Sequence, residues 1–286
     1  MPLTATELEQ AAEGQAISLP VLQPASAPEY SFRQRVCSGY YALWYELGEW
    51  LAWSRGTYQE SPVGRFQHLS GIQQARITIL QQRFSVRFER HAGQSTALKQ
   101  YDYLDMLERT WSTCDLPRSV GGVVHDIGSS NFWYASALHA FFRPSELVGI
   151  ELEGHRLYLN GYSRLDYARG YIQHLPNTRF EIGNYLQYQQ QADVITAWYP
   201  FVTPKPVLAW RLPLSVLDPQ AFFSQVTHNL RHNGLFVMVN QGGEEAAVAA
   251  RYCRQVGLSL SQSYKLRNPI RPRIPPVVSV WKHSPE

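Results

Sequence analysis

The fold of this chain is decided by the stretch Gly122-Val123-Val124-His125-Asp126-Ile127-Gly128-Ser129-Ser130-Asn131-Phe132. A short apolar run ends in an acid, and a glycine, two serines and an asparagine follow before a helical pattern begins. This order predicts a strand, a tight turn and a helix N-terminus, the geometry that binds nucleotide-like ligands at the carboxyl end of a parallel strand. Phosphate is a less natural ligand at this turn, because Asp126 would place a negative charge beside a pyrophosphate.

A second apolar run, Leu147-Val148-Gly149-Ile150-Glu151, also ends in an acid. A carboxylate at that point can accept hydrogen bonds from both ribose hydroxyls of a nucleoside. Glu153 is a nearby competitor for the role, and the alternative is that both acids face solvent beyond a strand end. We expect the turn from Asp126 to Asn131 and the carboxylate of Glu151 to line one cleft.

Strand and helix patterns alternate from Val120 onward, which is typical of a parallel sheet covered on both faces. The predicted strands are 123–126, 147–151, 179–182, 193–197, 235–240, 258–266 and 277–281, the last two joined by a proline-rich loop. The predicted helices are 132–142, 155–174 with Gly161 inside it, one that Asp218 caps and His232-Asn233-Gly234 ends, and one that Glu244 and Glu245 open.

At these residues the chain resembles the class I S-adenosylmethionine-dependent methyltransferases. In that family the first strand ends in an acid followed by a Gly-x-Gly-x-Gly turn, and here Asp126-Ile127-Gly128 matches its first part. The ribose-binding acid that ends the second strand matches Glu151, and the adenine-contacting pair after the third strand matches Gly183-Asn184. The resemblance covers residues 119 to about 284. It implies a doubly wound α/β fold with a mostly parallel seven-stranded sheet, closed by an antiparallel pair.

The turn departs from the family pattern, because Ser130 and Phe132 stand where the second and third glycines belong. A glycine turn lets the backbone approach a ligand closely. Serine still fits such a turn. A phenylalanine there predicts that the helix start is displaced or that the pocket is narrowed.

The resemblance implies S-adenosylmethionine as cofactor and a set of residues that hold it. That set is Asp126, Gly128, Ser129, Ser130, Glu151, Asn184 and Tyr185. Each has a plainer alternative: Asp126 can cap the following helix, Asn184 can form an ordinary turn, and Tyr185 can be an exposed loop residue.

Trp198-Tyr199-Pro200-Phe201 follows the fourth predicted strand, where this family places groups that contact the substrate. Members that methylate amino groups often carry an acid or amide before Pro-Pro-Tyr or Pro-Pro-Phe, and Trp198 stands at that place. Indole has one donor and no acceptor, so it cannot take a hydrogen bond from a substrate amine. We therefore assign Trp198, Tyr199 and Phe201 to the binding of a flat or apolar substrate, with a packed loop as the alternative.

Composition sets wider bounds on the protein. The 286 residues are 44% hydrophobic, enough to bury a core, and the formal net charge of +3 creates no global field for nucleic acid or an anionic membrane. Three scattered thiols, Cys37, Cys114 and Cys253, suit a reducing compartment and offer no zinc or disulfide framework. Residues 1–15 have no basic stretch before an apolar run, so we expect a cytoplasmic protein without a secretory signal.

The N-terminal third is predicted to be helical, with helices over 36–53, 72–88 and 101–111 after a loose connector at 20–28. A break near 117–122 divides the chain into a helical extension or lid, 1–118, and a Rossmann-like methyltransferase domain, 119–286. Glu46 and Glu49 make 36–53 a packed helix rather than a membrane span. Its apolar stripe consists of Val36, Tyr40, Leu43, Leu47 and Leu51, widened by Trp44, Trp50 and Trp53.

An apolar stripe of this kind is expected to bury against something. We expect it to pack near the loop from Trp198 to Phe201 and to form part of the acceptor pocket. The alternatives are that the helices cover the far face of the sheet or a partner subunit.

Several remaining patterns receive plain interpretations. His228 and His232, four apart on a predicted helix, lack a third ligand and do not predict a metal site. His125 and His139 are interpreted as hydrogen-bonded core histidines. Lys265, Arg267, Arg271 and Arg273 form a basic loop, which we interpret as a solvated edge rather than a nucleic-acid site.

The predicted function is methyl transfer from S-adenosylmethionine to a small or medium-sized acceptor, aromatic acceptors included. The expected partner is a small molecule, and no catalytic base is assigned. The first alternative is a non-catalytic binding or assembly module of the same fold, which the degenerate turn and the missing acid at Trp198 favour. The second is a nucleotide-binding oxidoreductase, which Asp126 disfavours.

Overall fold

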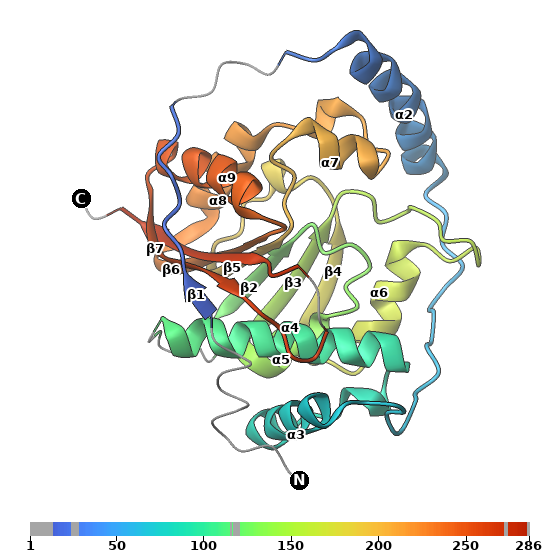
Figure 1. Ribbon diagram of the computed structural model, residues 1–286. Helices are drawn as coiled ribbons and strands as arrows, with labels where there is room; N and C mark the ends of the chain where they lie inside the picture. Colours follow the sequence, from blue (N-terminus) through green and yellow to red (C-terminus); the bar gives the residue numbers. More distant parts are fainter. Residues whose placement is uncertain (1–13, 24–28, 115, 117–120, 272–273, 285–286) are drawn as a thin grey trace.

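One mixed sheet forms the centre of the molecule (Figure 1). The computed structural model describes residues 14–23, 29–114, 116, 121–271 and 274–284. The strands are β1 (Gly14–Ala16), β2 (Val123–Ile127), β3 (Glu146–Glu151), β4 (Thr178–Ile182), β5 (Ala192–Trp198), β6 (Leu230–Asn240), β7 (Leu258–Leu266) and β8 (Val277–His283).

The helices fall into those before β2 and those between the later strands. Before β2 lie α2 (Phe32–Leu51), α3 (Gly71–Phe84), the short 3-10 helix η1 (Phe88–Arg90) and α4 (Gln94–Thr113). The later ones are α5 (Ala135–Phe142), α6 (Arg164–Ile172), η2 (Tyr185–Gln187), α7 (Pro204–Ala209), η3 (Leu214–Val216), α8 (Pro219–Asn229) and α9 (Gly243–Gln255).

The strand order identifies the fold. The sheet runs β1-β7-β8-β6-β5-β2-β3-β4, with β4 through β2 and β5 to β6 parallel and β8 inserted antiparallel between β6 and β7. From β2 onward this is the methyltransferase order, and it confirms the predicted doubly wound sheet with its closing antiparallel pair. The winding reverses beside β2, so the carboxyl ends of β2 and β5 lie at the switch point where open α/β sheets bind ligands.

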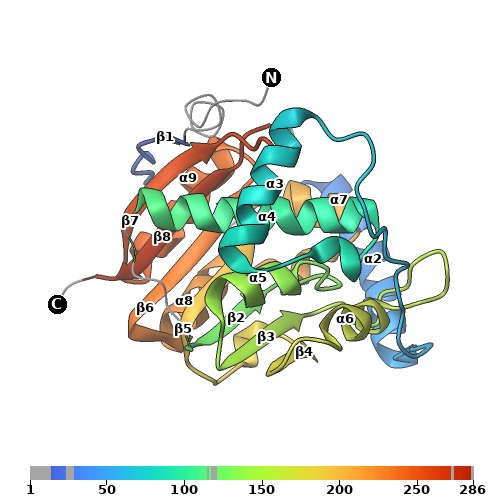
Figure 2. The same ribbon diagram turned by 90° about the horizontal axis from the view of Figure 1, so that it is seen from below.

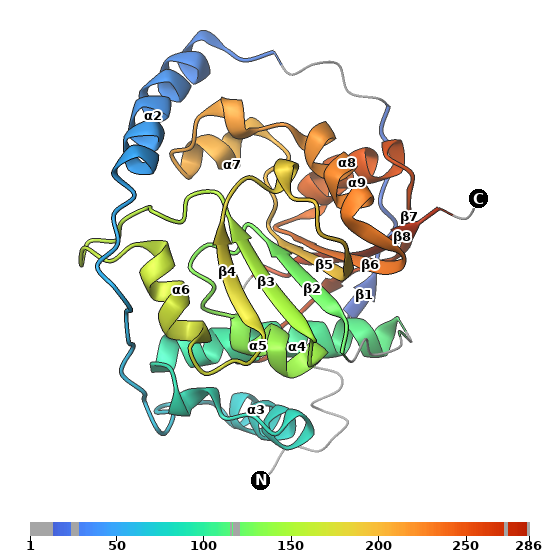
Figure 3. The same cartoon turned by 180° about the vertical axis from the view of Figure 1, so that it is seen from behind.

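Alternating apolar side chains give the sheet two covered faces. One face packs against α3, α4, α5 and α6 in a single cluster that includes Val124, Leu147 and Val194 (Figure 2). The other face packs against α8 and α9 through residues such as Val148 and Ile195 (Figure 3). α3, η1 and α4 of the N-terminal third therefore share a core with the strands, and α4 is buried along most of its length.

Several helix ends differ from the predicted ones, and two of these differences change an interpretation. The helix expected over 155–174 begins only at Arg164, because Ser163 and Asp166 form a capping box there and Gly161 lies in a turn at φ 77°. The helix expected to stop at His232-Asn233-Gly234 ends at Asn229, and those residues belong to β6. His228 and His232 thus do not share a helix.

Gly234 is needed for close approach rather than as a helix stop. A Cβ at Gly234 would lie 2.9 Å from the Arg231 carbonyl oxygen and 3.0 Å from that of Asp193. Glycine is the residue that permits two backbones to come this close. The same His-Asn-Gly pattern is therefore compatible with a helix end and with a close approach between two paired strands.

The apolar stripe on α2 is the largest departure from expectation. Its side chains face solvent: Leu43 is 68% exposed and Trp50 79%, and none of the helix residues is buried. The opposite face, which carries Ser38 and Tyr45, is the one that meets α7 and η3. The prediction that the stripe is buried was wrong.

The N-terminal third also contributes a strand that the sequence did not predict. β1 pairs antiparallel with β7, so the chain enters the sheet before α2 begins. Among the described helices, none combines the length and the apolar composition that a bilayer span requires. Four of the segments discussed from the sequence lie outside the described residues: most of the N-terminal residues 1–15, the connector residues 24–28, the break residues 117–120, and Arg273 of the basic loop.

Candidate functional site

The turn after β2 keeps a glycine-type backbone without the glycines. Gly128, Ser130 and Phe132 have φ values of 69°, 55° and 56°, so every second residue lies in the left-handed region. Such a conformation costs an ordinary residue about 1–2 kcal/mol relative to the right-handed region. The conformation therefore persists at the two positions where the family's glycines are replaced.

Phe132 explains why the helix start is displaced. Its ring is fully buried and lies against Gly149 of β3, where an added Cβ would come within 2.6 Å of the ring. α5 begins three residues later than predicted, at Ala135. Of the two consequences expected of the phenylalanine, the displaced helix start is the one observed.

Glu151 is held beside the turn by main-chain donors. The Ser130 amide donates to its Oε2 at 2.6 Å and the Glu153 amide donates to its Oε1 at 2.9 Å. The side chain is 8% exposed. The turn and the acid are therefore in direct contact at the carboxyl ends of adjacent parallel strands, as the spacing of the two acids predicted.

Asp126 is buried at the switch point on the α4 and α5 face. Tyr134 donates to its Oδ2 at 2.6 Å and Thr196 of β5 donates to its Oδ1 at 2.5 Å. Burial raises the pKa of Asp126 to about 7, although these two hydrogen bonds oppose the rise. Asp126 thus joins β2, β5 and α5 instead of capping α5 with its carboxylate.

Arg164 at the start of α6 also binds Glu151. Its Nη1 lies 2.8 Å from Glu151 Oε1 and 3.2 Å from Glu153 Oε2. Burial works to lower the pKa of Arg164, but the two carboxylates outweigh it and raise that pKa. A carboxylate offers about four acceptor positions, and three at Glu151 are occupied.

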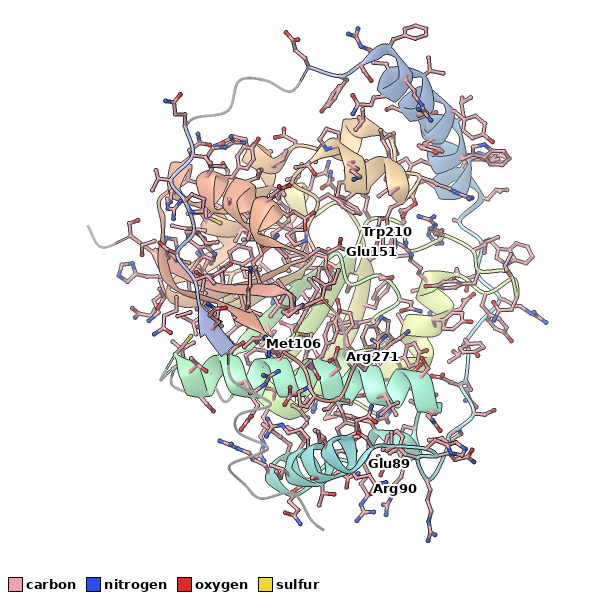
Figure 4. The ribbon with its side chains drawn as sticks, viewed as in Figure 1. Glu89, Arg90, Met106, Glu151, Trp210 and Arg271 are labelled. Atoms are coloured by element: carbon pink, nitrogen blue, oxygen red, sulfur yellow. The ribbon has the colours of Figure 1, made fainter. Side chains whose placement is uncertain are left out.

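The segment between β3 and α6 covers this edge of the sheet. Arg156 Nη1 donates to the Trp210 carbonyl at 2.9 Å, and the Arg164 guanidinium lies 5.8 Å from the centre of the Trp210 ring. Figure 4 shows Trp210 beside Glu151. Tyr158 lies over Ser130, and burial raises its pKa. The site is thus shielded by residues that the sequence did not single out.

Two polar side chains of the turn lack partners. In the described part of the chain, Ser129 Oγ and Asn131 Oδ1 are buried without a hydrogen bond. A buried polar atom is normally satisfied, so an orphan at a turn of this kind indicates a ligand group. The amino-acid end of S-adenosylmethionine carries the donors and acceptors that such atoms need, and the turn in this respect fits the cofactor. Asn131 was not among the predicted site residues.

The predicted adenine residues lie at the end of β4. Asn184 is exposed, and its Oδ1 accepts from the Leu186 amide at 3.0 Å as the cap of η2. Tyr185 is buried, with its ring 6.2 Å from His125 and 5.8 Å from Tyr188. The alternative given for Asn184, an ordinary turn, is thus present, whereas the alternative of an exposed Tyr185 was wrong.

The predicted substrate residues do not form one wall. Trp198 is buried, with its ring 4.0 Å from Tyr103 of α4. Tyr199 has φ 59°, and its amide donates to Val239 at 2.7 Å. Phe201 instead joins the small cluster under α7, in which Tyr45 of α2 also packs. α2 therefore reaches the neighbourhood of this loop through its less apolar face.

The histidine interpretations divide. His125 is fully buried, but neither ring nitrogen has a hydrogen-bond partner among the described residues, so its prediction as a hydrogen-bonded core histidine was wrong in that part. Burial lowers its pKa to about 4. His139 is half-buried and hydrogen-bonds the backbone of Pro176. No cluster of three metal-ligand side chains occurs within the described ranges.

Neither a protein-family model nor the sequence of a curated protein matches this chain. Solved structures that resemble it include a SAM-dependent methyltransferase from Aquifex aeolicus, 11% identical at a TM-score of 0.47, covering 64% of this chain and 95% of that one. Another, an S-adenosylmethionine-dependent methyltransferase from Clostridium acetobutylicum, is 9% identical at 0.45 and covers 74% and 98%.

A third similar structure is the TehB-like SAM-dependent methyltransferase from Corynebacterium glutamicum. It is 17% identical at a TM-score of 0.41, and the match covers 62% of this chain and 88% of that one. The fold assignment rests on the strand order described above, and these likenesses add nothing about the acceptor.

Proposed function

We propose that this protein transfers a methyl group from S-adenosylmethionine to a small or medium-sized acceptor. The observation that carries the proposal is the turn after β2. Three alternating left-handed residues bring the Ser130 amide to Glu151 at the switch point of the sheet. A strained backbone at two non-glycine positions persists only where its surroundings hold it, and such strain clusters at functional sites.

The assignment of cofactor groups follows the positions of the polar atoms. Gly128, Ser129 and Asn131 would hold the amino-acid end, since two of their side chains have no partner in the described chain. Glu151 would take the ribose and Asn184 the adenine edge. Ser130 supports Glu151 through its amide, and Asp126 would support the turn through its hydrogen bonds with Tyr134 and Thr196.

The cofactor, when bound, supplies an electrophilic methyl group on a sulfonium for direct displacement. The chain's own residues then have to orient the two reactants and exclude water. The buried Trp198 and the Tyr158–Trp210 cover are placed for water exclusion, and Phe201 with α2 and α7 would shape the acceptor side. No general base is assigned, because one is required only when the acceptor must lose a proton.

A second candidate function is a non-catalytic binding or assembly module of the same fold. The observation that favours it is Arg164, which already neutralises Glu151 and leaves about one acceptor position for two ribose hydroxyls. Under the first proposal Arg164 turns toward Glu153 when the ribose arrives. Under the second it stays, and the cofactor does not bind.

Calorimetric titration of the full chain with S-adenosylmethionine, S-adenosylhomocysteine and NAD separates these functions. Methyl transfer predicts binding of both adenosyl ligands and none of NAD. Binding of NAD alone would indicate the oxidoreductase. If none of the three ligands gives a heat of binding and none raises the melting temperature at millimolar concentration, the non-catalytic module is supported, because a ligand of the native state must raise its stability.

A further inference from the structure

A cavity lies away from the turn and from Glu151. Its volume is about 780 Å³, and it is lined by the end of α3, the residues around η1, the outer side of α5 and the segment after α6. Figure 4 shows Arg90 in the helical layer on one side of the sheet, well apart from Glu151 and Trp210. The two sites therefore do not overlap.

The lining of this cavity is basic. Its described lining contains no carboxylate, and six side chains in it carry or can acquire a positive charge: Arg87, Arg90, His91, Arg143, His139 and His174. The chain as a whole has a formal net charge of only +3. The positive charge is thus concentrated at this cavity, and the electrostatic potential there favours the binding of anions.

The three arginines are available to a ligand. Arg87, Arg90 and Arg143 are exposed, and within the described chain none of them forms an ion pair. Glu89, the nearest acid in sequence, is turned away, since Tyr101 donates to its Oε2 at 2.8 Å and Gln81 to its Oε1 at 3.1 Å.

Neighbouring arginines of α3 behave differently. Arg76 binds Asp105 and Glu108 of α4, and Arg83 also binds Glu108. Asp105 and Glu108 are thus paired with arginines beside the cavity, and neither carboxylate lines it.

The histidines bring further donors. The rings of His91 and His174 stack at 4.5 Å and 15°, and His174 Nε2 lies 3.5 Å from Ser136 Oγ. Burial, and then the positive charges of His91 and His139, lower the pKa of His174, while burial lowers that of His139. An anion among them would reverse these shifts, because it favours the charged imidazolium.

We propose that this cavity binds a phosphate-bearing ligand. Planar guanidinium groups donate paired hydrogen bonds to phosphate oxygens, and a phosphate monoester carries enough charge to face several arginines at once, whereas a carboxylate carries only one negative charge. The volume lies in the range of small-molecule sites, about 300–1,000 Å³.

The test compares the wild-type chain with the double variant Arg90→Gln/Arg143→Gln and the control Arg267→Gln. All three arginines are exposed, and Arg267 lies in the basic loop outside the cavity. The probes are inorganic phosphate, uridine 5′-monophosphate, acetate and a twelve-residue oligothymidylate, titrated by calorimetry and followed by the histidine proton resonances. Acetate distinguishes phosphate from any anion, and the oligonucleotide distinguishes a free phosphate from a polynucleotide backbone.

We expect phosphate and the nucleotide to bind wild type and the control equally and to move the resonances of His139 and His174. The double variant should lose at least about tenfold in affinity, the scale of charged hydrogen bonds. Tighter binding of the oligonucleotide, lost in the same variant, would identify a polynucleotide as the source of the phosphate. Equal affinity in the double variant, a loss only in Arg267→Gln, or equal binding of acetate would overturn the proposal. None of these outcomes depends on S-adenosylmethionine binding.

Discussion

The main-chain amide of Ser130 donates to the carboxylate of Glu151 across 2.6 Å, from a residue whose φ is 55°. This bond joins the turn after β2 to the end of β3. It shows why the left-handed conformation survives without glycine, since a charge-assisted hydrogen bond stabilises the fold by about 1.5–3 kcal/mol and offsets the backbone strain. The bond uses the backbone of Ser130, so it does not depend on the serine hydroxyl, which hydrogen-bonds Tyr158 instead.

We predict that Ser130→Gly stabilises the protein by up to about 1 kcal/mol. Glycine removes the left-handed penalty of about 1–2 kcal/mol. Part of this gain in stability is lost, because glycine also gives the unfolded chain more conformational entropy. Urea unfolding at pH 7 measures the difference. A loss of stability above 0.5 kcal/mol would show that the serine hydroxyl, and not the backbone, holds the turn.

Phe132→Gly should have the opposite sign, although its φ is almost the same. The ring of Phe132 is fully buried against Gly149, and loss of a buried aromatic ring costs about 3–5 kcal/mol, more than the strain that glycine relieves. We expect a net destabilisation of about 2–4 kcal/mol in the same urea experiment. A neutral result would mean that the ring does not fill the space beside β3.

The pH dependence of stability should report on Asp126. Its pKa is 3.8 in an ordinary environment and about 7 here, so between these values the native state binds more protons than the unfolded state. The free energy of unfolding therefore falls as the pH rises through this range, by on the order of 4 kcal/mol at most. Asp126→Asn cannot titrate and should lose that part of the slope.

Urea unfolding of wild type and Asp126→Asn at pH 5 and pH 8 checks this. The free energy of unfolding of the variant, minus that of wild type, should be larger at pH 8 than at pH 5. Parallel pH profiles for the two proteins would contradict the burial of a raised-pKa carboxyl at this position.

The sheet could be predicted from sequence because its signal is local. Apolar runs ending at Asp126 and Glu151 mark strands whose carboxyl ends meet at one edge, and the structure confirms this. Arg164 could not be found in this way, because its role arises from a cap at Ser163 that places the first residue of α6 beside the end of β3. Asn131 belongs to the predicted turn, but only the structure shows that its Oδ1 is buried without a hydrogen-bond partner among the described residues, which distinguishes it from an ordinary turn residue.

The apolar stripe of α2 is a test of what periodicity can predict. Helical spacing correctly indicated a helix over most of Phe32–Leu51 but gave the wrong burial, because the face with Ser38 and Tyr45 packs on α7 and η3. Leu43→Ser should then change the free energy of unfolding by no more than about 0.5 kcal/mol. Leu80→Ala, at a fully buried site of α3, should cost about 2–5 kcal/mol.

Urea unfolding of dilute protein distinguishes the two outcomes for α2. A cost at Leu43 that approaches the cost at Leu80 would show that the stripe is covered in solution.

Three inferences from the sequence stay predictions. They are the boundary at 118/119 between an N-terminal extension and a methyltransferase domain, the cytoplasmic location, and the contribution of α2 to an acceptor pocket.

The central claim is that Glu151 holds the ribose of an adenosyl cofactor. It is tested most directly by the calorimetric affinity of S-adenosylhomocysteine for wild type, Glu151→Gln and Glu146→Gln. Glu146 lies at the other end of β3, where it pairs with Arg179, so Glu146→Gln makes the same chemical change away from the turn. Glutamine keeps an oxygen for the Ser130 amide, and Glu153 remains beside Arg164, so the fold should survive.

We predict that wild type and Glu146→Gln bind S-adenosylhomocysteine alike. Glu151→Gln should bind it about 10- to 150-fold more weakly, which corresponds to about 1.5–3 kcal/mol. Circular dichroism and thermal melting establish that each variant is folded. Unchanged affinity in folded Glu151→Gln, or no binding by wild type at millimolar ligand, would contradict the account.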